Sequence, residues 1–433
     1  MRVLSTELVG KDGAQVECCG WVRSVREMGK MVFVVVADRQ GKFQVVFKEP
    51  NVVEKAKKLG LEDVVVVRGK AKKDERVKEG GAEVEATDLE VLAIADRSLP
   101  VDIAGKTETN FEARFDHRVL DLRREKPQNL FRIQHTICQA FREYLSNEGF
   151  IEIHTPKIIS TGTEGGANLF PVVYFDREAF LAQSPQFYKQ MLVGAGFERV
   201  FELAPVFRAE EHDTPFHLNE YVSLDFEFGF IKDETDVMRH TAGSIAHIFT
   251  RLKEKNSREL AFFGIDLQVP KLPIPIVHYW ELPEIFKKVG HDFPDPLGDL
   301  SREEEKKLYE YGKKEFGSDF LFVDNYPAAK RPAYTMPYEP DPKYTRGYDL
   351  LYKGLEIVTG GQRIHQYGLL QEKFREKGYD VDNFGFYFEV FKYGMPPHGG
   401  QAIGLERLTT RILELDNVRE AAFFPRDKKR LTP

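Results

Sequence analysis

The sequence has few cysteines and no long apolar run, and each shortage excludes a class of protein. Its three cysteines, Cys18, Cys19 and Cys138, provide neither a disulfide framework nor the paired spacing of a zinc site. No apolar run reaches the roughly 18 residues that a membrane span needs, and the first residues lack the apolar core of a signal peptide. We therefore expect a cytoplasmic protein without a membrane partner.

The chain also lacks a strong excess of positive charge. Its formal net charge is −7, and no half of the chain is a basic block. Two short basic clusters, 70–73 and 428–430, are compatible with phosphate contacts and equally with a solvated surface. Charge alone neither supports nor excludes an RNA partner. The 433 residues exceed the size at which a single core stops growing, so we expect two domains.

Residues 1–95 contain short β-rich runs that are separated by glycine and charged turns. The predicted strands are 16–22, 31–38, 41–47, 64–69 and 82–86, with a helix near 53–59 before the fourth. This order is typical of an OB-fold, a small barrel that binds single-stranded nucleic acid on one face. Phe33 lies on the second strand and Gln44 on the third. An aromatic ring there can stack on an unpaired base, and Phe33 is equally compatible with the barrel core.

A polar stretch, 96–128, follows the barrel and is interpreted as a hinge. The next segment predicts a helix over 129–148, because its apolar residues recur at helical spacing. Gly149 ends this helix, and an extended segment that contains Pro156 comes after it. We expect the second domain to occupy 129–433.

Near the carboxyl end, residues 399–408 read GGQAIGLERL, a glycine-spaced apolar strand that leads into a helix. Glycines at this spacing let a flat ligand approach the backbone, and Arg407 at the helix start can meet a polyphosphate. Alone, the pattern is also typical of strand–turn–helix packing. Far upstream, residues 207–210 read FRAE. Together the two segments resemble motifs 3 and 2 of the class II aminoacyl-tRNA synthetases, and the helix–glycine–strand–proline order of 129–159 resembles their motif 1.

The resemblance extends over nearly the whole chain and implies an α+β fold. It implies an OB-fold β-barrel for anticodon binding over 1–95, and a class II catalytic domain in which an antiparallel sheet is flanked by helices. Motif 1 builds the dimer interface of this family, so a homodimer with Pro156 at its two-fold axis is implied. The chain looks most similar to the compact aspartyl enzymes of archaeal type, which some bacteria also carry.

The resemblance implies a site in which ATP activates a carboxylate. Motif 2 spans 207–225 and predicts two antiparallel strands joined by a polar loop. Arg208, Glu210 and Arg407 are implied to act in catalysis by holding the α-phosphate and adenine. The implied ATP-binding residues are Arg208, Glu210, His217, Leu218, Tyr221, Glu356, Gly404 and Arg407. One position departs from the family, because Phe216 stands where an arginine usually precedes the histidine, and one loop contact with ATP or the tRNA end is therefore not implied.

A second pattern predicts magnesium ligands. Asp349 and Glu356 are seven positions apart with Lys353-Gly354 between them, which is typical of a hairpin whose carboxylates face each other. Mg²⁺ prefers carboxylate and hydroxyl oxygens together with substrate phosphates. Glu356 and Thr359, with Asp349 close by, are therefore the predicted ligands. No Cys/His cluster indicates zinc.

The amino-acid substrate is predicted from two cations. A β-carboxylate in a closed pocket needs positive charge, whereas a β-amide does not. Lys189 in 183–189 and Arg363 in 360–365 supply it, and both segments resemble aspartyl-tRNA synthetase, where these positions hold the aspartate side chain. The aspartate site that the resemblance implies comprises Glu164, on a loop that closes over the substrate, with Gln186, Lys189, Arg208, Asp225, Thr359 and Arg363.

The implied activity is that of an aspartate–tRNA ligase, which forms aspartyl-adenylate from L-aspartate and ATP and transfers the aspartyl group to tRNA(Asp). Whether tRNA(Asn) is also a substrate stays open. Phe33 and Gln44 are implied to contact the shared anticodon bases, and Arg23 and Glu79 lie where the remaining base is read. These last two residues match neither the strict nor the relaxed members of the family.

Two other functions stay open at this point. One is a synthetase-like enzyme that amidates aspartate to asparagine, and the predicted OB-like domain argues against it. The other is a catalytically silent RNA-binding paralogue. The presence of Arg208, Glu210, Glu356 and Arg407 argues against that alternative.

Overall fold

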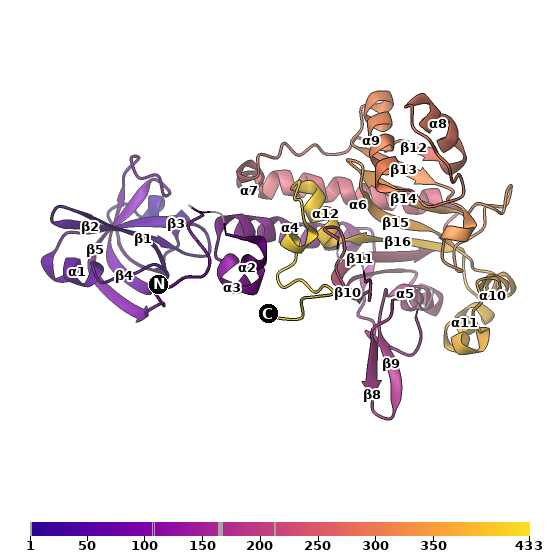
Figure 1. Cartoon of the computed structure of the whole chain (residues 1–433), viewed down its shortest axis with the longest axis horizontal. Coiled ribbons are helices and arrows are strands. Elements are labelled where there is room, and N and C mark those ends of the chain that lie inside the picture. The colour runs from indigo at the N-terminus through magenta and orange to yellow at the C-terminus, as the bar shows by residue number, and fades with distance from the viewer. Residues whose placement is uncertain (1, 106, 108, 163–167, 212–213) are drawn as a thin grey trace. The chain divides into compact units, whose positions relative to one another are not determined.

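The computed structural model describes residues 1–433 except 1, 106, 108, 163–167 and 212–213 (Figure 1). The chain divides into two compact units, 1–117 and 118–433. The division falls inside the predicted hinge, where the structure has the short helices α2 (Phe111–Asp116) and α3 (Arg118–Asp121). Movement about this stretch stays a prediction. No helix in the described part of the chain is long and apolar enough to span a bilayer.

The first unit is built around a closed barrel with the strand order β1-β2-β3-β5-β4. Its elements are β1 (Gln15–Met28), β2 (Met31–Ala37), β3 (Lys42–Phe47), α1 (Pro50–Ala56), β4 (Val64–Lys73) and β5 (Ala82–Ala93). Val32, Val34 and Val36 alternate along β2 and pack into the barrel core. The predicted barrel and its element order are confirmed, although β1, β4 and β5 extend beyond the predicted strands.

The second unit contains an eight-stranded sheet with the order β12-β13-β14-β15-β16-β11-β10-β6. The strands of this unit are β6 (Ile151–Glu152), β7 (Ile158–Ile159), β8 (Pro171–Tyr174), β9 (Arg177–Leu181), β10 (Arg199–Phe207), β11 (Glu220–Gly229), β12 (Ile276–His278), β13 (Phe320–Asp324), β14 (Gly347–Tyr352), β15 (Glu356–Arg363) and β16 (His398–Gly404). From β13 to β10 all neighbours are antiparallel, as predicted. At the two edges, β12 and β6 pair in parallel, so the prediction of an antiparallel sheet is wrong there. Long crossovers, not hairpins, connect these edge strands to their neighbours.

Two long helices, α4 and α6, pack against each other, and α6 contacts β15 and β16 (Figure 1). The remaining helices are shorter. The helices of the unit after α3 are α4 (Glu125–Asn147), α5 (Gln186–Leu192), α6 (Glu234–Lys255), α7 (Ser257–Phe262), α8 (Leu282–Lys288), α9 (Arg302–Phe316), α10 (Tyr367–Glu376), α11 (Gly385–Lys392) and α12 (Leu405–Ile412). Ile133, Ile137 and Phe141 of α4 enter the main core, as their spacing predicts. The helix begins four residues earlier than predicted, because Pro127 is tolerated in a first turn.

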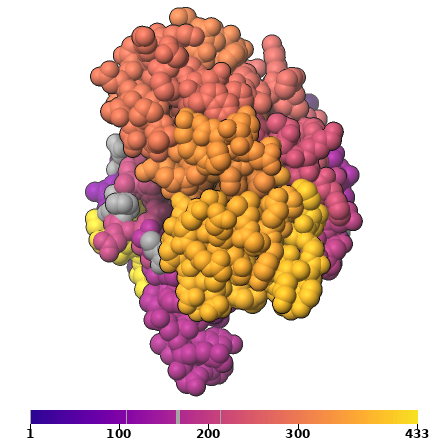
Figure 2. Space-filling view, turned by 90° about the vertical axis from the view of Figure 1, so that its right-hand side faces the viewer, coloured from indigo at the N-terminus to yellow at the C-terminus, as the bar shows by residue number. Residues whose placement is uncertain are grey.

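A small sheet with the order β7-β9-β8 lies apart from the large one. Its β8–β9 hairpin protrudes from the body of the second unit in both views (Figures 1 and 2). Val173 and Phe175 near its tip are almost fully exposed. The hairpin comes shortly after the segment that resembles motif 1. Its tip adds exposed apolar side chains to this part of the chain.

The turn between β14 and β15 shapes the candidate magnesium site. Lys353 and Gly354 both have positive φ, +48° and +71°, which is the backbone of a two-residue hairpin turn. A side chain at Gly354 would stand 3.1 Å from Cα of Lys306 in α9. The predicted hairpin is confirmed, and its turn packs directly on the first half of α9.

Candidate active site

A cavity of about 340 Å³ opens over the middle of the large sheet. Strands β11, β14, β15 and β16 contribute side chains to its wall, together with the loop between β10 and β11 and the start of α12. The predicted site residues that line it are Gln186, Arg208, Glu210, His217, Leu218, Tyr221, Asp225, Asp349, Glu356, Thr359, Arg363, Gly404 and Arg407. Segments that are distant in the sequence therefore converge on one cavity.

The β10–β11 hairpin supplies the residues of motif 2, and the predicted pair of antiparallel strands is confirmed. Arg208 follows the last residue of β10, and its guanidinium carbon lies 5.7 Å from the ring centroid of Tyr221. Burial raises the pKa of Tyr221, so its hydroxyl stays neutral. His217 Nε2 lies 3.7 Å from Glu210 Oε2, and its Nδ1 is 2.6 Å from the hydroxyl of Thr214. The hairpin thus presents a cation, an aromatic ring and a carboxylate to the cavity.

Strand β16, which belongs to motif 3, lies between β11 and β15. A side chain at Gly400 would collide with the backbone oxygen of Phe226 and the carboxylate of Glu227. This glycine therefore makes room for the neighbouring strand, so the close approach that the glycine spacing of 399–408 predicts is made here by protein. Gly404 does line the cavity, and a side-chain carbon placed on it would stand 3.5 Å from Arg407 Cβ, which is ordinary van der Waals contact.

The first turn of α12 places two titratable side chains, Glu406 and Arg407, at the cavity. Glu406 accepts hydrogen bonds from the backbone N–H of Val222 at 3.1 and 3.2 Å, and burial raises its pKa to about 8. Arg407 Nη1 lies 3.4 Å from Glu356 Oε1. The helix start thus combines a carboxyl that burial keeps protonated near neutral pH with a cation that faces a second carboxylate.

The oxygen ligands predicted for magnesium are gathered on the β14–β15 hairpin. Asp349 and Thr359 are direct cross-strand partners. Glu356 and Thr359 would lie on opposite faces of a regular strand, but an irregularity in the register near Glu356 brings them together. The Thr359 hydroxyl donates to Glu356 Oε1 at 2.9 Å. Although burial alone would raise it, the pKa of Glu356 is lowered by the charge of Arg407 and by this hydrogen bond.

Arg331 is a cavity residue that the sequence did not indicate. Its Nη2 lies 2.7 Å from Asp349 Oδ2, and its guanidinium carbon lies 3.8 Å from the ring centroid of Tyr326. Burial nevertheless raises the pKa of Asp349. Arg331 comes from a proline-containing loop without a recognisable motif, so only the tertiary structure reveals its partner.

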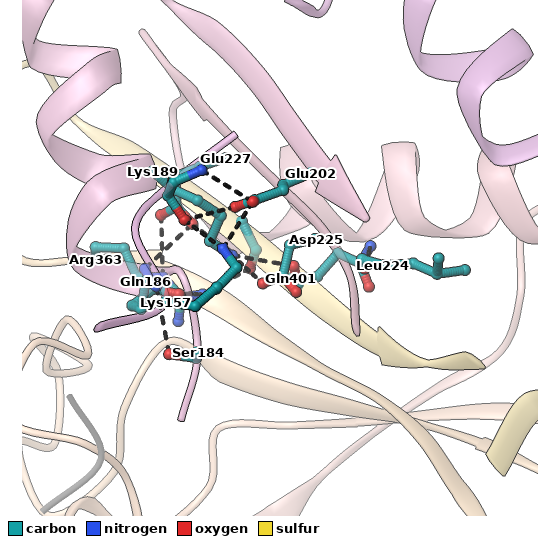
Figure 3. A network of polar contacts seen from close by, with 12 residues as sticks. Lys157, Ser184, Gln186, Lys189, Glu202, Leu224, Asp225, Glu227, Arg363 and Gln401 are labelled. Atoms are coloured by element: carbon teal, nitrogen blue, oxygen red, sulfur yellow. Dashed lines mark hydrogen bonds and ion pairs between the residues drawn. The ribbon is translucent and has the colours of Figure 1, made fainter. Parts of the chain in front are cut away.

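At the other end of the cavity, four buried charged side chains form a compact cluster (Figure 3). Lys189 Nζ lies 2.6 Å from Asp225 Oδ1 and 3.5 Å from Glu227 Oε2, and Arg363 Nε donates to Glu227 Oε1 at 3.1 Å. Burial opposes ionisation of Glu227, but the charges of Arg363 and Lys189 hold its pKa below the ordinary value. Arg363 and Asp225 line the cavity, whereas Lys189 lies behind Asp225 and does not. Glu227, two positions after Asp225 on β11, was missed because no motif marks it.

The predicted site also includes Glu164 and a magnesium ion. Glu164 lies outside the described residues. No three His, Cys, Asp or Glu side chains gather as a metal-binding group among the residues that the structure describes. A divalent ion at the β14–β15 hairpin would therefore bind two carboxylates and a hydroxyl, with its other ligands coming from substrate or water, which suits Mg²⁺.

The barrel of the first unit carries the predicted anticodon residues. In the β2–β3 register Phe33 lies opposite Val46, and Gln44 lies opposite Val35. Phe33 is half-buried and alternates with the core valines, so it faces outward and is not part of the barrel core. Gln44 donates to Glu83 at 2.9 Å.

The two positions predicted to read the remaining base lie elsewhere on the barrel. Arg23, in β1, forms an ion pair with the buried Glu62. Glu79 is half-buried in the turn between β4 and β5. The ion pair gives the Arg23 guanidinium a fixed partner in the protein.

Comparisons with known proteins agree with this architecture. Residues 110–428 match the family described as tRNA synthetases class II (D, K and N), and residues 16–92 match the OB-fold nucleic acid binding domain. The whole chain is 44% identical to the whole of a protein from Archaeoglobus fulgidus named aspartate–tRNA(Asp/Asn) ligase. It is 43% identical, over 98% of this chain and 97% of the relative, to a Pyrococcus horikoshii protein named aspartate–tRNA(Asp) ligase.

Solved structures show the same fold over the whole chain. The crystal structure of asparaginyl-tRNA synthetase from Pyrococcus horikoshii complexed with asparaginyl-adenylate superposes with a TM-score of 0.93 at 33% identity and covers 100% of both chains. Aspartyl tRNA synthetase from Entamoeba histolytica superposes with a TM-score of 0.89 at 31% identity and covers 100% of this chain and 93% of that one. The predicted α+β fold with its OB-fold barrel is confirmed.

Proposed function

The chain belongs to the class II tRNA synthetases of the D, K and N type, and on this premise we propose that it is an aspartate–tRNA ligase. It activates L-aspartate with ATP: a carboxylate oxygen of aspartate attacks the α-phosphorus, and pyrophosphate leaves. The terminal ribose hydroxyl of tRNA(Asp) then attacks the carbonyl carbon of aspartyl-adenylate, and AMP leaves. Such reactions depend on positioning and charge neutralisation and need no strong general base.

The observation that carries the proposal is the charge cluster at one end of the cavity. Arg363 and Asp225 stand on its wall with opposite charges, and Lys189 lies directly behind Asp225. L-aspartate presents the complementary pattern, with a β-carboxylate for the cations and an ammonium group for Asp225. A β-carboxylate adds an attraction between opposite charges at Arg363 that a β-amide lacks, so the pocket favours aspartate over asparagine.

The rest of the cavity suits ATP. Arg208 bridges the substrate carboxylate and the α-phosphate, and Glu210 accepts from the adenine amino group. Adenine lies between the ring of Tyr221 and the guanidinium of Arg407, and His217 meets the outer phosphate. In support, these side chains line the same cavity as Asp225 and Arg363. The backbone at Leu218 and Gly404 completes the nucleotide wall.

Magnesium ions fit the oxygen-only donor set of Glu356, Thr359 and Asp349. When bound there, Mg²⁺ neutralises charge on the phosphates of ATP. The protein prepares this site by holding Glu356 ionised through Arg407 and by fixing its orientation through the Thr359 hydroxyl. Arg331 holds Asp349 in place at the same time.

Amino-acid-dependent ATP–pyrophosphate exchange tests the proposal, because it reports adenylate formation without tRNA. We expect exchange that requires Mg²⁺ and is supported by L-aspartate far better than by L-asparagine. Better exchange with asparagine would overturn the assignment of the charge cluster as a carboxylate pocket. Free asparagine produced from aspartate and ammonia without tRNA would instead favour the amidating alternative.

We further propose that the enzyme charges both tRNA(Asp) and tRNA(Asn). Three observations bear on this. Relatives named aspartate–tRNA(Asp/Asn) ligase are 44% and 45% identical to this chain, although a relative with the narrower name is 43% identical. Phe33 and Gln44 share an outward face that suits stacking and hydrogen bonding to the shared bases. Arg23, near the discriminating base, is engaged by Glu62 and is less available to select it.

Charging of the two transcripts side by side tests this extension. A preference for tRNA(Asp) on the order of a hundredfold, roughly 2.7 kcal/mol, would contradict relaxed specificity. An Arg23→Ala variant serves as the internal comparison, because it removes one of the two side chains predicted to lie where the remaining base is read. We expect it to change the ratio of the two tRNA substrates by less than about threefold.

Three further assignments belong to the same proposal. The enzyme acts as a homodimer with Pro156 at the two-fold axis, as motif 1 implies. The loop that contains Glu164 closes over bound aspartate. The stretch 96–128 is a hinge between the anticodon-binding and catalytic domains.

A further inference from the structure

Phe216, in the loop between β10 and β11, lies on the wall of the active-site cavity and is 42% exposed. Its ring faces a cation that comes from a distant segment. The guanidinium carbon of Arg302, the first residue of α9, lies 5.3 Å from the ring centroid. An aromatic face attracts a cation at this distance, and a planar guanidinium can stack on it.

The fold fixes the start of α9 at this place. Ser301 caps the helix, because its hydroxyl accepts from the N–H of Glu304 at 3.3 Å while the Glu304 carboxylate accepts from the Ser301 N–H at 2.6 Å. The residues that follow this turn, Glu305, Lys306 and Tyr309, pack against Gly354 in the hairpin that carries the predicted magnesium ligands. The capped helix start therefore holds Arg302 beside Phe216, which lines the cavity.

Arg302 has a second tether on its own helix. Its Nη1 donates to Glu305 Oε2 at 2.7 Å, and the Glu305 side chain is buried while that of Arg302 is 37% exposed. The Phe216 ring and the Glu305 carboxylate therefore hold the Arg302 guanidinium. Its partial exposure leaves it able to turn toward a ligand.

We propose that Arg302 is an ATP-binding residue that contacts the polyphosphate of the nucleotide, with the ring of Phe216 as its platform. The inference rests on the proposed function, because it deepens the description of the same ATP site. On nucleotide binding the guanidinium exchanges Glu305 for phosphate oxygens, which it can contact in bidentate fashion. The loop between β10 and β11 carries a phenylalanine at this position, so the positive charge beside it comes from α9.

Steady-state ATP–pyrophosphate exchange by the full-length protein tests this assignment. R302A should raise the KM for ATP about tenfold or more, while the KM for aspartate and the melting temperature change little. F216A should raise the KM for ATP in the same direction and to a smaller extent, because the cation loses its platform. R302M, which keeps the apolar stem, replaces R302A if that variant does not fold.

A matched control separates ATP binding from a structural role. E305Q weakens the tether but keeps the cation and its aromatic platform, so its KM for ATP should stay within about twofold of wild type. The double variant F216R/R302A returns a guanidinium from the loop side and should recover part of the lost ATP affinity. A purely structural Arg302 would predict neither result.

The proposal is overturned if R302A and R302M keep the wild-type KM for ATP, or if E305Q loses as much ATP affinity as R302A. Failure of the proposed function looks different, because the wild-type protein would then show no aspartate-dependent exchange. In that case calorimetric titration with MgATP still decides the role of Arg302. Equal affinities for wild type and R302A would exclude the contact, and a loss of about tenfold would support it.

Discussion

Lys189 Nζ lies 2.6 Å from Asp225 Oδ1, and the exposed fractions of the two side chains are 0% and 2%. The pair belongs to a cluster in which two cations face two carboxylates, so no charge is buried without a partner. Removing one member leaves the others buried and uncompensated, which costs more than the pair itself contributes. The cluster is therefore both a structural element and the base of the proposed aspartate pocket.

Substitutions within this cluster test its role in aspartate binding. Lys189→Leu and Arg363→Leu should each weaken aspartate binding by ~2–5 kcal/mol and leave ATP affinity nearly unchanged. Isothermal titration with each substrate measures both affinities. An equal loss of ATP affinity would show that these cations do not form an amino-acid pocket.

Lys157→Leu is the matched control for the lysine substitution. Lys157 Nζ lies 2.7 Å from the buried carboxylate of Glu202 (Figure 3), and neither residue lines the cavity. Its loss also leaves a buried carboxylate without its cation and should lower the melting temperature. We expect aspartate affinity to be retained in this variant.

The buried carboxyl of Glu406 predicts a pH dependence of stability. Its pKa in the folded protein is about 8, against an ordinary value of 4.5, because burial disfavours the charged form. Below pH 4.5 the carboxyl is protonated in both the folded and the unfolded protein, and the stability that this protonation provides is fully present. As the pH rises from 4.5 to 8 this stability is lost, and the loss is complete above pH 8. At about 1.4 kcal/mol per unit of pKa, the loss is on the order of a few kcal/mol.

Glu406→Gln removes this titration and keeps an acceptor for the Val222 N–H. The melting temperature of E406Q minus that of wild type should therefore rise between pH 5 and pH 8 and level off above. Thermal unfolding without ligands, over a series of buffers, measures this difference. A difference that does not vary with pH would show that Glu406 does not titrate in this range.

The magnesium requirement tests the β14–β15 hairpin. Glu356→Gln should raise the Mg²⁺ concentration for half-maximal exchange at least about tenfold, because an amide oxygen is a weaker ligand than a carboxylate. Thr359→Val should have a smaller effect in the same direction. Glu414→Gln is the control, since Glu414 pairs with Lys353 at the turn of this hairpin and does not line the cavity. An unchanged Mg²⁺ requirement in E356Q would remove this residue from the metal site.

Exposed apolar residues around Pro156 predict the oligomeric state. Ile151 and Ile158 are 48% and 52% exposed, which suits a surface that a second copy covers. Sedimentation velocity should show a dimer, and Ile158→Lys should shift it toward monomer. Ile276→Lys, at the exposed edge strand β12, should leave the dimer intact. A fully active wild-type monomer at assay concentrations would contradict the proposed homodimer.

Local sequence patterns predicted the elements that carry the site, and long-range contacts escaped them. The β10–β11 hairpin, the β14–β15 hairpin and the passage from β16 to α12 follow from turn residues and apolar spacing. Glu227 was missed because its importance depends on its contacts with Lys189 and Arg363, which the sheet brings together. Arg331 was missed because its partner Asp349 lies on a distant strand.

Sequence patterns also do not predict how deeply a side chain is buried. Lys189 was expected on the pocket surface, but it lies one layer deeper, behind Asp225. The glycine spacing of 399–408 predicts the close approach of a ligand, but at Gly400 the approaching group is the carboxylate of Glu227. Residue type and spacing alone do not show whether the space beside a strand residue is occupied by another part of the protein or is open to a ligand.

Aminoacylation of tRNA(Asp) transcript with radiolabelled L-aspartate and, in parallel, with L-asparagine tests the central claim most directly. It requires the amino-acid pocket, the ATP site and the RNA-binding barrel in one assay. We predict efficient charging with aspartate and negligible charging with asparagine in the presence of MgATP. Charging with asparagine at a comparable rate, or no charging with either amino acid, would contradict the assignment as an aspartate–tRNA ligase.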